Sequence, residues 1–111
     1  MNSLLSDSGA IRVDIRIDYG ETFLRYITIR ENGVLKNMTY YDAELAIYYK
    51  HMDKLLEVFN NDNGKLQYIS TGRYYIAELL TIKSGTYQYY FKTIDSLGII
   101  RHLFAGNFIY E

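Results

Sequence analysis

The chain contains no cysteine, no proline and no tryptophan, and its 111 residues carry a formal net charge of only −1. Without cysteine there is no disulfide framework and no thiol chemistry, so a cytoplasmic location is the simplest expectation. The near-neutral charge argues against a dedicated nucleic-acid-binding protein, which needs a basic surface to neutralise phosphates. We therefore expect no direct sequence-specific binding of DNA or RNA.

Long apolar runs and targeting signals are also missing. No segment approaches the roughly 18 consecutive apolar residues of a membrane-spanning helix, so we expect no membrane contact. The opening segment MNSLLSDSG lacks the basic start and long apolar stretch of a signal peptide. We expect residues 1–9 to be a flexible terminus. Residues 10–111 should form a single domain, which is long enough to bury one core.

Patterns for catalysis and for metal binding are absent as well. The two histidines, His51 and His102, have neither the spacing of metal ligands nor cysteine partners. No serine occupies a nucleophile elbow, and no glycine-rich phosphate loop occurs. The NNDNG segment resembles a calcium loop only in its glycine, because the carboxylates needed at both ends of such a loop are missing. We therefore expect no enzyme, no metal and no cofactor.

What the chain does contain is a regular punctuation by glycine. Outside one gap, the eight glycines recur every 8 to 13 residues, which is typical of strands joined by short turns. Residues 10–20 alternate between apolar and charged side chains, which predicts a half-buried strand with a charged outer face. Asn32-Gly33 suits a type I′ hairpin turn. Further strands are expected over 22–30, 34–40, 65–70, 74–83, 86–94 and 98–104, with a short last one over 107–111.

The long gap between Gly33 and Gly64 predicts a helix. Thr39 is a suitable N-cap, and the apolar residues after it repeat at spacings of three and four, as on one helix face. This stripe consists of Tyr41, Leu45, Tyr48, Met52, Leu55, Leu56 and Phe59. The sequence thus predicts an α+β fold in the order βββ-α-ββββ. One amphipathic helix would pack on one face of an antiparallel sheet of about six or seven strands.

Thirteen tyrosines are the most distinctive feature of the composition, and eight of them stand in four adjacent pairs. In a strand, neighbouring side chains point to opposite faces, so each pair places one ring on each face of a sheet. We expect the more apolar set to point inward: Tyr74, Ile76, Leu80, Ile82, Tyr87, Tyr89 and Phe91. The opposite face then combines aromatic and polar residues, as protein interfaces do. Its candidate binding residues are Tyr75, Leu79, Gln88, Tyr90 and Lys92.

A second candidate surface lies on the predicted helix. Ile47 and Val58 fall roughly opposite the main stripe, and His51 and Lys54 lie between them. An aligned apolar set of this kind on an exposed face indicates contact with another chain.

These features favour a non-catalytic protein-binding module that occupies a surface of a larger host protein or protein–nucleic-acid complex. Small inhibitors from phages and mobile elements, including anti-CRISPR and other anti-defence proteins, have compositions of this type. Two alternatives stay open. One is a small-molecule or nucleotide binder, in which tyrosines stack on a base and Arg73, Arg101 or Lys92 contacts the phosphates. The other is a structural homo-oligomer, such as a homodimer paired through exposed sheet edges.

Overall fold

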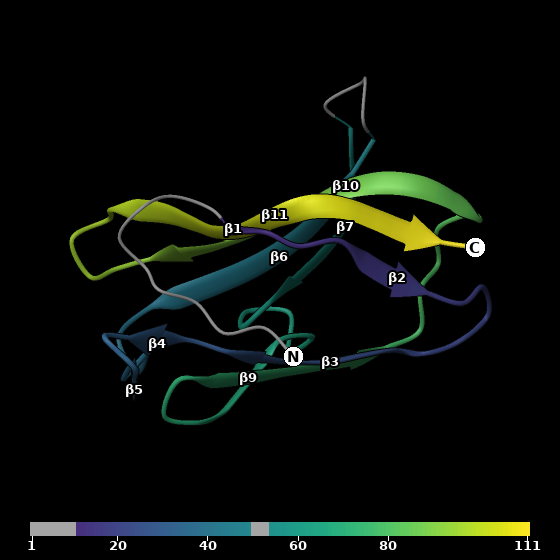
Figure 1. Ribbon diagram of the computed structural model, residues 1–111. Coiled ribbons are helices and arrows are strands. Elements are labelled where there is room, and N and C mark those ends of the chain that lie inside the picture. Colours follow the sequence, from purple (N-terminus) through teal and green to yellow (C-terminus); the bar gives the residue numbers. More distant parts are fainter. Residues whose placement is uncertain (1–10, 50–53) are drawn as a thin grey trace.

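The structure, a computed structural model, describes residues 11–49 and 54–111 (Figure 1). The described residues form eleven strands and no helix, so the predicted α+β fold is wrong and the protein is all-β. The strands are Ile11–Arg12 (β1), Ile15–Ile17 (β2), Phe23–Thr28 (β3), Arg30–Glu31 (β4), Val34–Leu35 (β5), Asp42–Tyr48 (β6), Leu55–Asn60 (β7), Gln67–Ser70 (β8), Arg73–Glu78 (β9), Gly85–Ile94 (β10) and Ile100–Tyr110 (β11). The predicted flexible terminus, residues 1–9, lies outside the described residues, as do His51 and Met52.

Two sheets face each other across a common core (Figure 1). In the larger sheet, β7, β6, β10 and β11 are successive antiparallel neighbours, and β1 and β2 both pair with β11 in parallel. The smaller sheet has the antiparallel order β3-β9-β8. The predicted hairpin turn at Asn32-Gly33 is confirmed between β4 and β5, where both residues have the positive φ that a type I′ turn requires.

The predicted helix in the gap between Gly33 and Gly64 is instead the antiparallel hairpin of β6 and β7. Ala43, Leu45 and Ile47 alternate with a period of two, and all three are buried. Phe59 of β7 lies opposite Leu45 and is buried as well. Spacings of three and four are compatible with a helix as well. The strand forms instead because β6 pairs with β10 on one side and with β7 on the other, which satisfies its backbone hydrogen bonds and matches the alternation of its buried residues.

The alternating N-terminal segment is a strand with a charged outer face, as predicted, but it is broken at Val13-Asp14 and pairs in parallel. The break lies over Gly106 of β11, where a Cβ atom would meet the Val13 carbonyl oxygen at 2.3 Å. The Tyr89 hydroxyl donates a hydrogen bond of 2.6 Å to that carbonyl. The backbone amide of Asn107 donates a hydrogen bond of 2.9 Å to the Asp14 carboxylate, 93 residues away in sequence. Turn signals could not predict a pairing between such distant segments.

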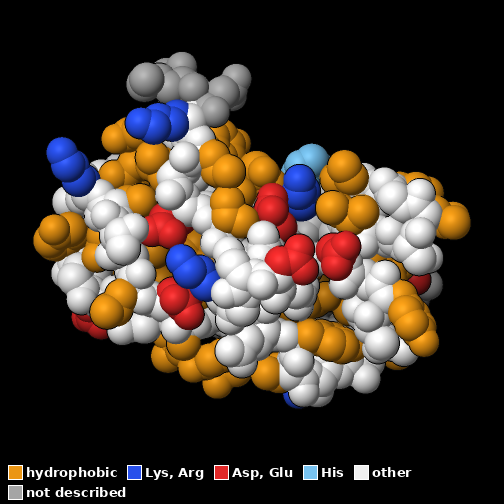
Figure 2. Space-filling view, turned by 180° about the vertical axis from the view of Figure 1, so that it is seen from behind, with side chains coloured by type: hydrophobic (Ala, Val, Ile, Leu, Met, Phe, Trp, Pro, Cys, Tyr) orange, Lys and Arg blue, Asp and Glu red, His pale blue; other side chains and the backbone are white. Residues whose placement is uncertain are grey.

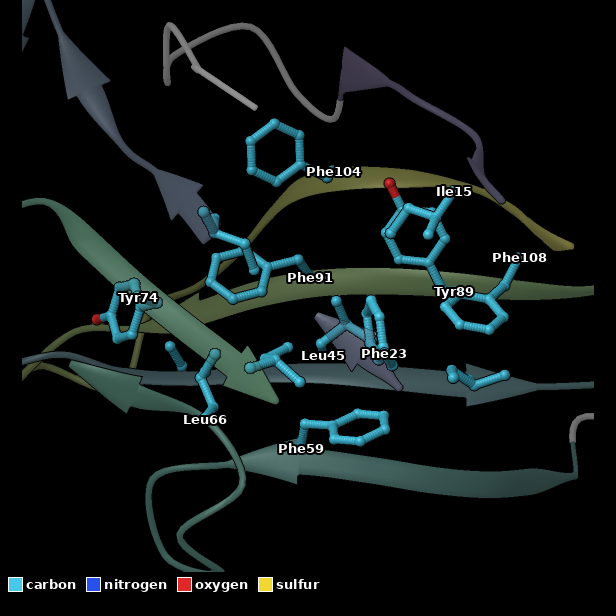
Figure 3. Close-up of a cluster of buried hydrophobic side chains, with 14 of the residues drawn as sticks. Ile15, Phe23, Leu45, Phe59, Leu66, Tyr74, Tyr89, Phe91, Phe104 and Phe108 are labelled. Atoms are coloured by element: carbon cyan, nitrogen blue, oxygen red, sulfur yellow. The ribbon is translucent and has the colours of Figure 1, made fainter. Parts of the chain in front are cut away.

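The core between the sheets is built largely from aromatic rings (Figure 3). Phe23 of β3 meets Phe59 and Phe108 of the larger sheet edge-on, with centroid distances of 5.4 and 5.2 Å. Tyr74 of β9 meets Phe91 of β10 in the same way at 5.9 Å. Edge-on ring pairs stabilise by about 0.5–1.5 kcal/mol beyond the burial of their area. Five of the residues predicted to point inward are buried: Tyr74, Ile76, Tyr87, Tyr89 and Phe91. Leu80 and Ile82 follow the end of β9 and are only partly buried against the core.

Two of the expected short connections between successive strands instead cross from one sheet to the other: the connection from β2 to β3 and that from β9 to β10. The turns at Thr71-Gly72 and Leu97-Gly98 connect paired strands, as expected. Ser84-Gly85 does not, because β9 ends at Glu78 and the chain then crosses to β10 in the other sheet. Strands that the sequence suggested to be neighbours therefore lie in different layers, and this decides where the candidate binding residues point.

No helix in the described part of the chain is long and apolar enough to cross a bilayer.

Candidate protein-interaction surface

The structure divides the predicted aromatic face between the two sheets. Tyr75 lies on β9 with its side chain on the outer face of the smaller sheet, and Leu79 directly follows the end of that strand. Gln88, Tyr90 and Lys92 lie along β10, on the outer face of the larger sheet. Because each sheet turns its inner face to the common core, these two outer faces point in opposite directions. The five residues therefore do not form one surface.

The second predicted surface, on the expected helix, does not form. Ile47 is 0% exposed and belongs to the core. Val58 is half-buried on the outer face of the larger sheet, where it lies opposite Ala46. Lys54 is exposed in the connection between β6 and β7. His51 lies outside the described residues. In a strand pair with this register, Ile47 and Val58 point to opposite sides of the sheet, so the helical alignment is lost.

The side chains on the outer face of the larger sheet pack against one another. The Tyr90 ring lies 5.8 Å from the Tyr48 ring and 5.2 Å from the His102 ring, measured between centroids. The Lys92 ammonium lies 3.6 Å from the Glu44 carboxylate and 5.6 Å from the centre of the Tyr90 ring. Burial, followed by the nearby Glu44 carboxylate, raises the pKa of Tyr90 above its ordinary value. We call these five residues, together with Ala46, Val58 and Gln88, the closed face.

Ala46 shows how completely these neighbours cover the closed face. Its side chain is on the outer side of β6, yet the residue is 0% exposed. The residues opposite Ala46 on the two adjacent strands are Tyr90 and Val58. Their larger side chains flank the alanine. The centre of the closed face therefore offers little apolar area to a partner.

The outer face of the smaller sheet is different, because its apolar side chains remain accessible. Leu24 and Tyr26 of β3 are 54% and 55% exposed. Across the strand pair, Leu24 lies opposite Ala77, and Tyr26 lies opposite Tyr75, with ring centroids 5.0 Å apart. We call the following set the open face: Leu24, Tyr26, Gln67, Arg73, Tyr75, Ala77 and Leu79. In Figure 2, hydrophobic side chains line the lower rim of the molecule, on the side of the smaller sheet.

Two members of the open face, Leu24 and Tyr26, were not among the residues predicted from the sequence. The signal was present, because Phe23 and Ile27 alternate with Leu24 and Tyr26, so both faces of that strand are apolar. One of these faces is covered by the core, and the other is free to meet something outside the domain. Tyr75, which was predicted, lies on the same face, and Leu79, also predicted, directly follows the end of β9.

Exposed aliphatic residues also gather at the turn between β10 and β11. Leu97 is 83% exposed, and Ile99 and Ile100 are about half exposed. The Asp95 carboxylate accepts hydrogen bonds from the backbone amides of Leu97 and Ile99, at 2.9 and 3.0 Å, and thereby fixes the turn. This turn is narrow and carries no aromatic ring, so it presents less contact area than the open face.

The described residues hold no cluster of side chains placed to bind a metal ion: no group of three or more His, Asp or Glu side chains among them could hold one. A cavity of about 120 Å³ is lined by Asp42, Glu44 and Asp62, among others. Two of the polar groups that line it have partners within the fold. Glu44 pairs with Lys92, and the Asn61 side-chain oxygen accepts a hydrogen bond from the Ala43 backbone amide.

The three cations considered for nucleotide phosphates do not meet. Arg73 lies on β9 of the smaller sheet, whereas Lys92 and Arg101 lie on β10 and β11 of the larger one. Lys92 is engaged by Glu44. Nothing in this geometry favours a stacked nucleotide.

Comparisons with protein-family models, with curated proteins and with solved structures found no match to this chain.

Proposed function

We propose that the protein is a non-catalytic binding module that docks through its open face on a larger protein. The observation that carries this proposal is the exposure of Leu24 and Tyr26, each more than half exposed, beside the Tyr75 ring. Tyrosine contributes a large contact area together with a hydroxyl, and it is enriched among the residues that dominate binding energy.

The open face is also well prepared for binding. Its residues stand on paired antiparallel strands, which hold their backbone in place. A tyrosine has only two side-chain torsions to fix, so ordering Tyr26 and Tyr75 in a complex costs little entropy. Protein interfaces commonly consist of such an apolar, aromatic centre with a polar rim.

The charge on the open face specifies the partner further. Arg73 lies two residues before Tyr75 on β9 and is exposed, so it adds a cation at one end of the apolar area. A complementary partner has an apolar patch that accepts two tyrosine rings, with a carboxylate beside it. Such a partner would be a larger host protein, and covering its surface would be the mode of action, as for small anti-CRISPR and other anti-defence inhibitors.

The proposal is tested with tagged protein as bait in lysate of the native host, with and without nuclease. The protein captured is then purified, and its affinity is measured by calorimetry. We expect the Tyr26→Ser/Tyr75→Ser double variant to lose at least about 100-fold in affinity, since interface tyrosines often contribute about 2 kcal/mol or more each.

Two control variants decide where the partner binds. Tyr40→Ser changes an exposed tyrosine in the turn before β6, and Leu97→Ser changes the aliphatic turn. Both should leave the affinity within about threefold of the wild type. If the partner tolerates the double variant but not Leu97→Ser, the docking site is the turn and the open face is not used. Light scattering on the free protein should show a monomer at micromolar concentration; a dimer abolished by the double variant would make a second copy the occupant.

A further inference from the structure

A cavity of about 280 Å³ opens where the β6–β7 hairpin meets the crossover between the sheets. Its lining residues come from three places in the fold. Tyr49 directly follows β6, and Leu56 lies on β7. Thr81, Ile82 and Lys83 belong to the crossover from β9 to β10, and Tyr87 lies on β10.

Four of the six described residues that line the cavity are tyrosine or aliphatic. The Tyr49 and Tyr87 rings lie 5.5 Å apart between centroids and are inclined by 51°. Leu56 and Ile82 are half-buried and pack against the core. These four residues leave room for a flat or branched apolar group, as in typical small-molecule sites.

The crossover side of the cavity is held in place by hydrogen bonds. The Glu57 carboxylate, on the buried side of β7, accepts hydrogen bonds from the backbone amide and the hydroxyl of Thr81. The Lys65 ammonium lies 3.9 Å from the same carboxylate. The Tyr87 hydroxyl donates to the Lys83 carbonyl. The cavity is therefore formed in advance, which lowers the entropic cost of binding.

Lys83 is the single charged residue among the described residues that line the cavity. The Glu57 carboxylate, which holds the neighbouring Thr81, is already engaged with Thr81 and Lys65. No described carboxylate forms an ion pair with Lys83. A ligand with an apolar body and an anionic end would thus find both complements here, and a cationic ligand would find only the apolar one.

We propose that this cavity binds a small aromatic carboxylate, with its ring against Tyr49, Leu56 and Tyr87 and its carboxylate near Lys83. The available volume, at the lower limit of ligand sites, suits a molecule of about a dozen non-hydrogen atoms. This site is independent of the open face and of the protein partner proposed above.

The test is a titration of the ¹⁵N-labelled chain with 3-phenylpropionate, followed by NMR. The matched probe is 3-phenylpropylamine, which keeps the ring and the chain and reverses the charge. We expect saturable shifts around Tyr49, Leu56 and Ile82 with a Kd on the order of 1 mM, and binding of the amine at least about tenfold weaker. The Lys83→Met variant should remove this preference for the acid.

Two neighbouring leucines supply a matched pair of filling variants. Leu56→Trp fills the cavity and should abolish the shifts, whereas Leu55→Trp, at a residue that is 53% exposed and does not line the cavity, should retain them. If Leu56→Trp does not fold, Tyr49→Ala removes one wall at a partly exposed position and should weaken binding at least about fivefold.

Three results would overturn the proposal: no saturation at about 5 mM acid, equal affinity for acid and amine, or shifts that survive both cavity variants. The Tyr26→Ser/Tyr75→Ser variant should bind the acid like the wild type. The failure of either proposal is therefore distinguishable from the failure of the other.

Discussion

The closed face and the open face are the outer sides of the larger and the smaller sheet, and both place a tyrosine near an alanine in a central strand. On the closed face, Ala46 is inaccessible because Tyr90 and Val58 flank it. On the open face, Ala77 is exposed, and Tyr26 beside it on β3 is more than half exposed. Residue type alone therefore does not decide whether a sheet face is available to a partner. What decides is whether cross-strand neighbours are long enough and numerous enough to cover it.

The same contrast extends to the inward side of each sheet. Tyr89 of the larger sheet donates its hydroxyl hydrogen to the Val13 carbonyl. Tyr74 of the smaller sheet is equally buried, but its hydroxyl has no hydrogen-bond partner. Burial raises the pKa of both hydroxyls, that of Tyr89 to about 12. The buried tyrosine hydroxyl of the larger sheet thus has a hydrogen-bond partner, whereas that of the smaller sheet has none.

The largest difference is expected between two alanines. Ala46→Asp places a carboxylate among the packed side chains of the closed face and should cost at least about 3 kcal/mol of unfolding free energy. Ala77→Asp, at the exposed alanine, should cost no more than about 1 kcal/mol, the span of strand propensities. Urea denaturation of both variants measures the two values. Equal losses would show that the two faces are equally covered.

A smaller difference is expected between two tyrosines. Tyr90→Ser removes contacts with Tyr48, His102 and Lys92 and should cost about 2–3 kcal/mol. Tyr75→Ser removes a ring that contacts Tyr26 and should cost about 1 kcal/mol. Thermal unfolding followed by circular dichroism checks the order. A larger loss for Tyr75→Ser would mean that the open face stabilises the fold and is not reserved for binding.

The two buried hydroxyls provide a finer test. Tyr89→Phe leaves the Val13 carbonyl without its donor and should cost about 1–2 kcal/mol. Tyr74→Phe deletes an unpaired buried hydroxyl, so stability should stay the same or rise slightly. Each substitution removes one oxygen, so the difference in urea midpoint reports the hydrogen bond alone. The expectation fails if both variants lose the same amount.

The smallest effect is absent at neutral pH and appears only in alkaline solution. The pKa of Tyr89 is raised from 10.0 in the unfolded chain to about 12 in the fold, because burial disfavours the phenolate. The unfolded state therefore loses its proton first, and stability that is fully present below pH 10 declines as the pH rises toward 12. Tyrosine absorbance at 295 nm, recorded with unfolding curves, should show this decline and a shallower one in Tyr89→Phe. Identical slopes would contradict it.

Much of the sheet was predictable because strand patterns are local. The alternation of residues 10–20, the Asn32-Gly33 turn and the inward position of Tyr74 and Tyr89 all follow from neighbouring residues. The prediction of a helix is wrong for β6 and β7 because apolar residues in two strands with a bulge between Ile47 and Tyr48 also recur at spacings of three and four.

The candidate surface was predictable only in part, because its composition depends on which strands become neighbours. Residues 74–83 read as one long strand, but β9 ends at Glu78, and Ile82 packs against the core from the crossover. That change of layer separates Tyr75 from Tyr90. Local alternation contains no information about which of two sheets a strand joins, so the division of the predicted face required the tertiary structure.

The parallel pairing of β1 and β2 with β11 has a consequence for the order of folding. The first described strands find their partner only when residues 100–110 are available, so the larger sheet closes late in synthesis. Pairings over such sequence distances slow folding, since the chain must lose the entropy of a long loop before the contacts form. Until β11 arrives, β10 carries an unpaired edge, which is where association between incomplete chains would begin.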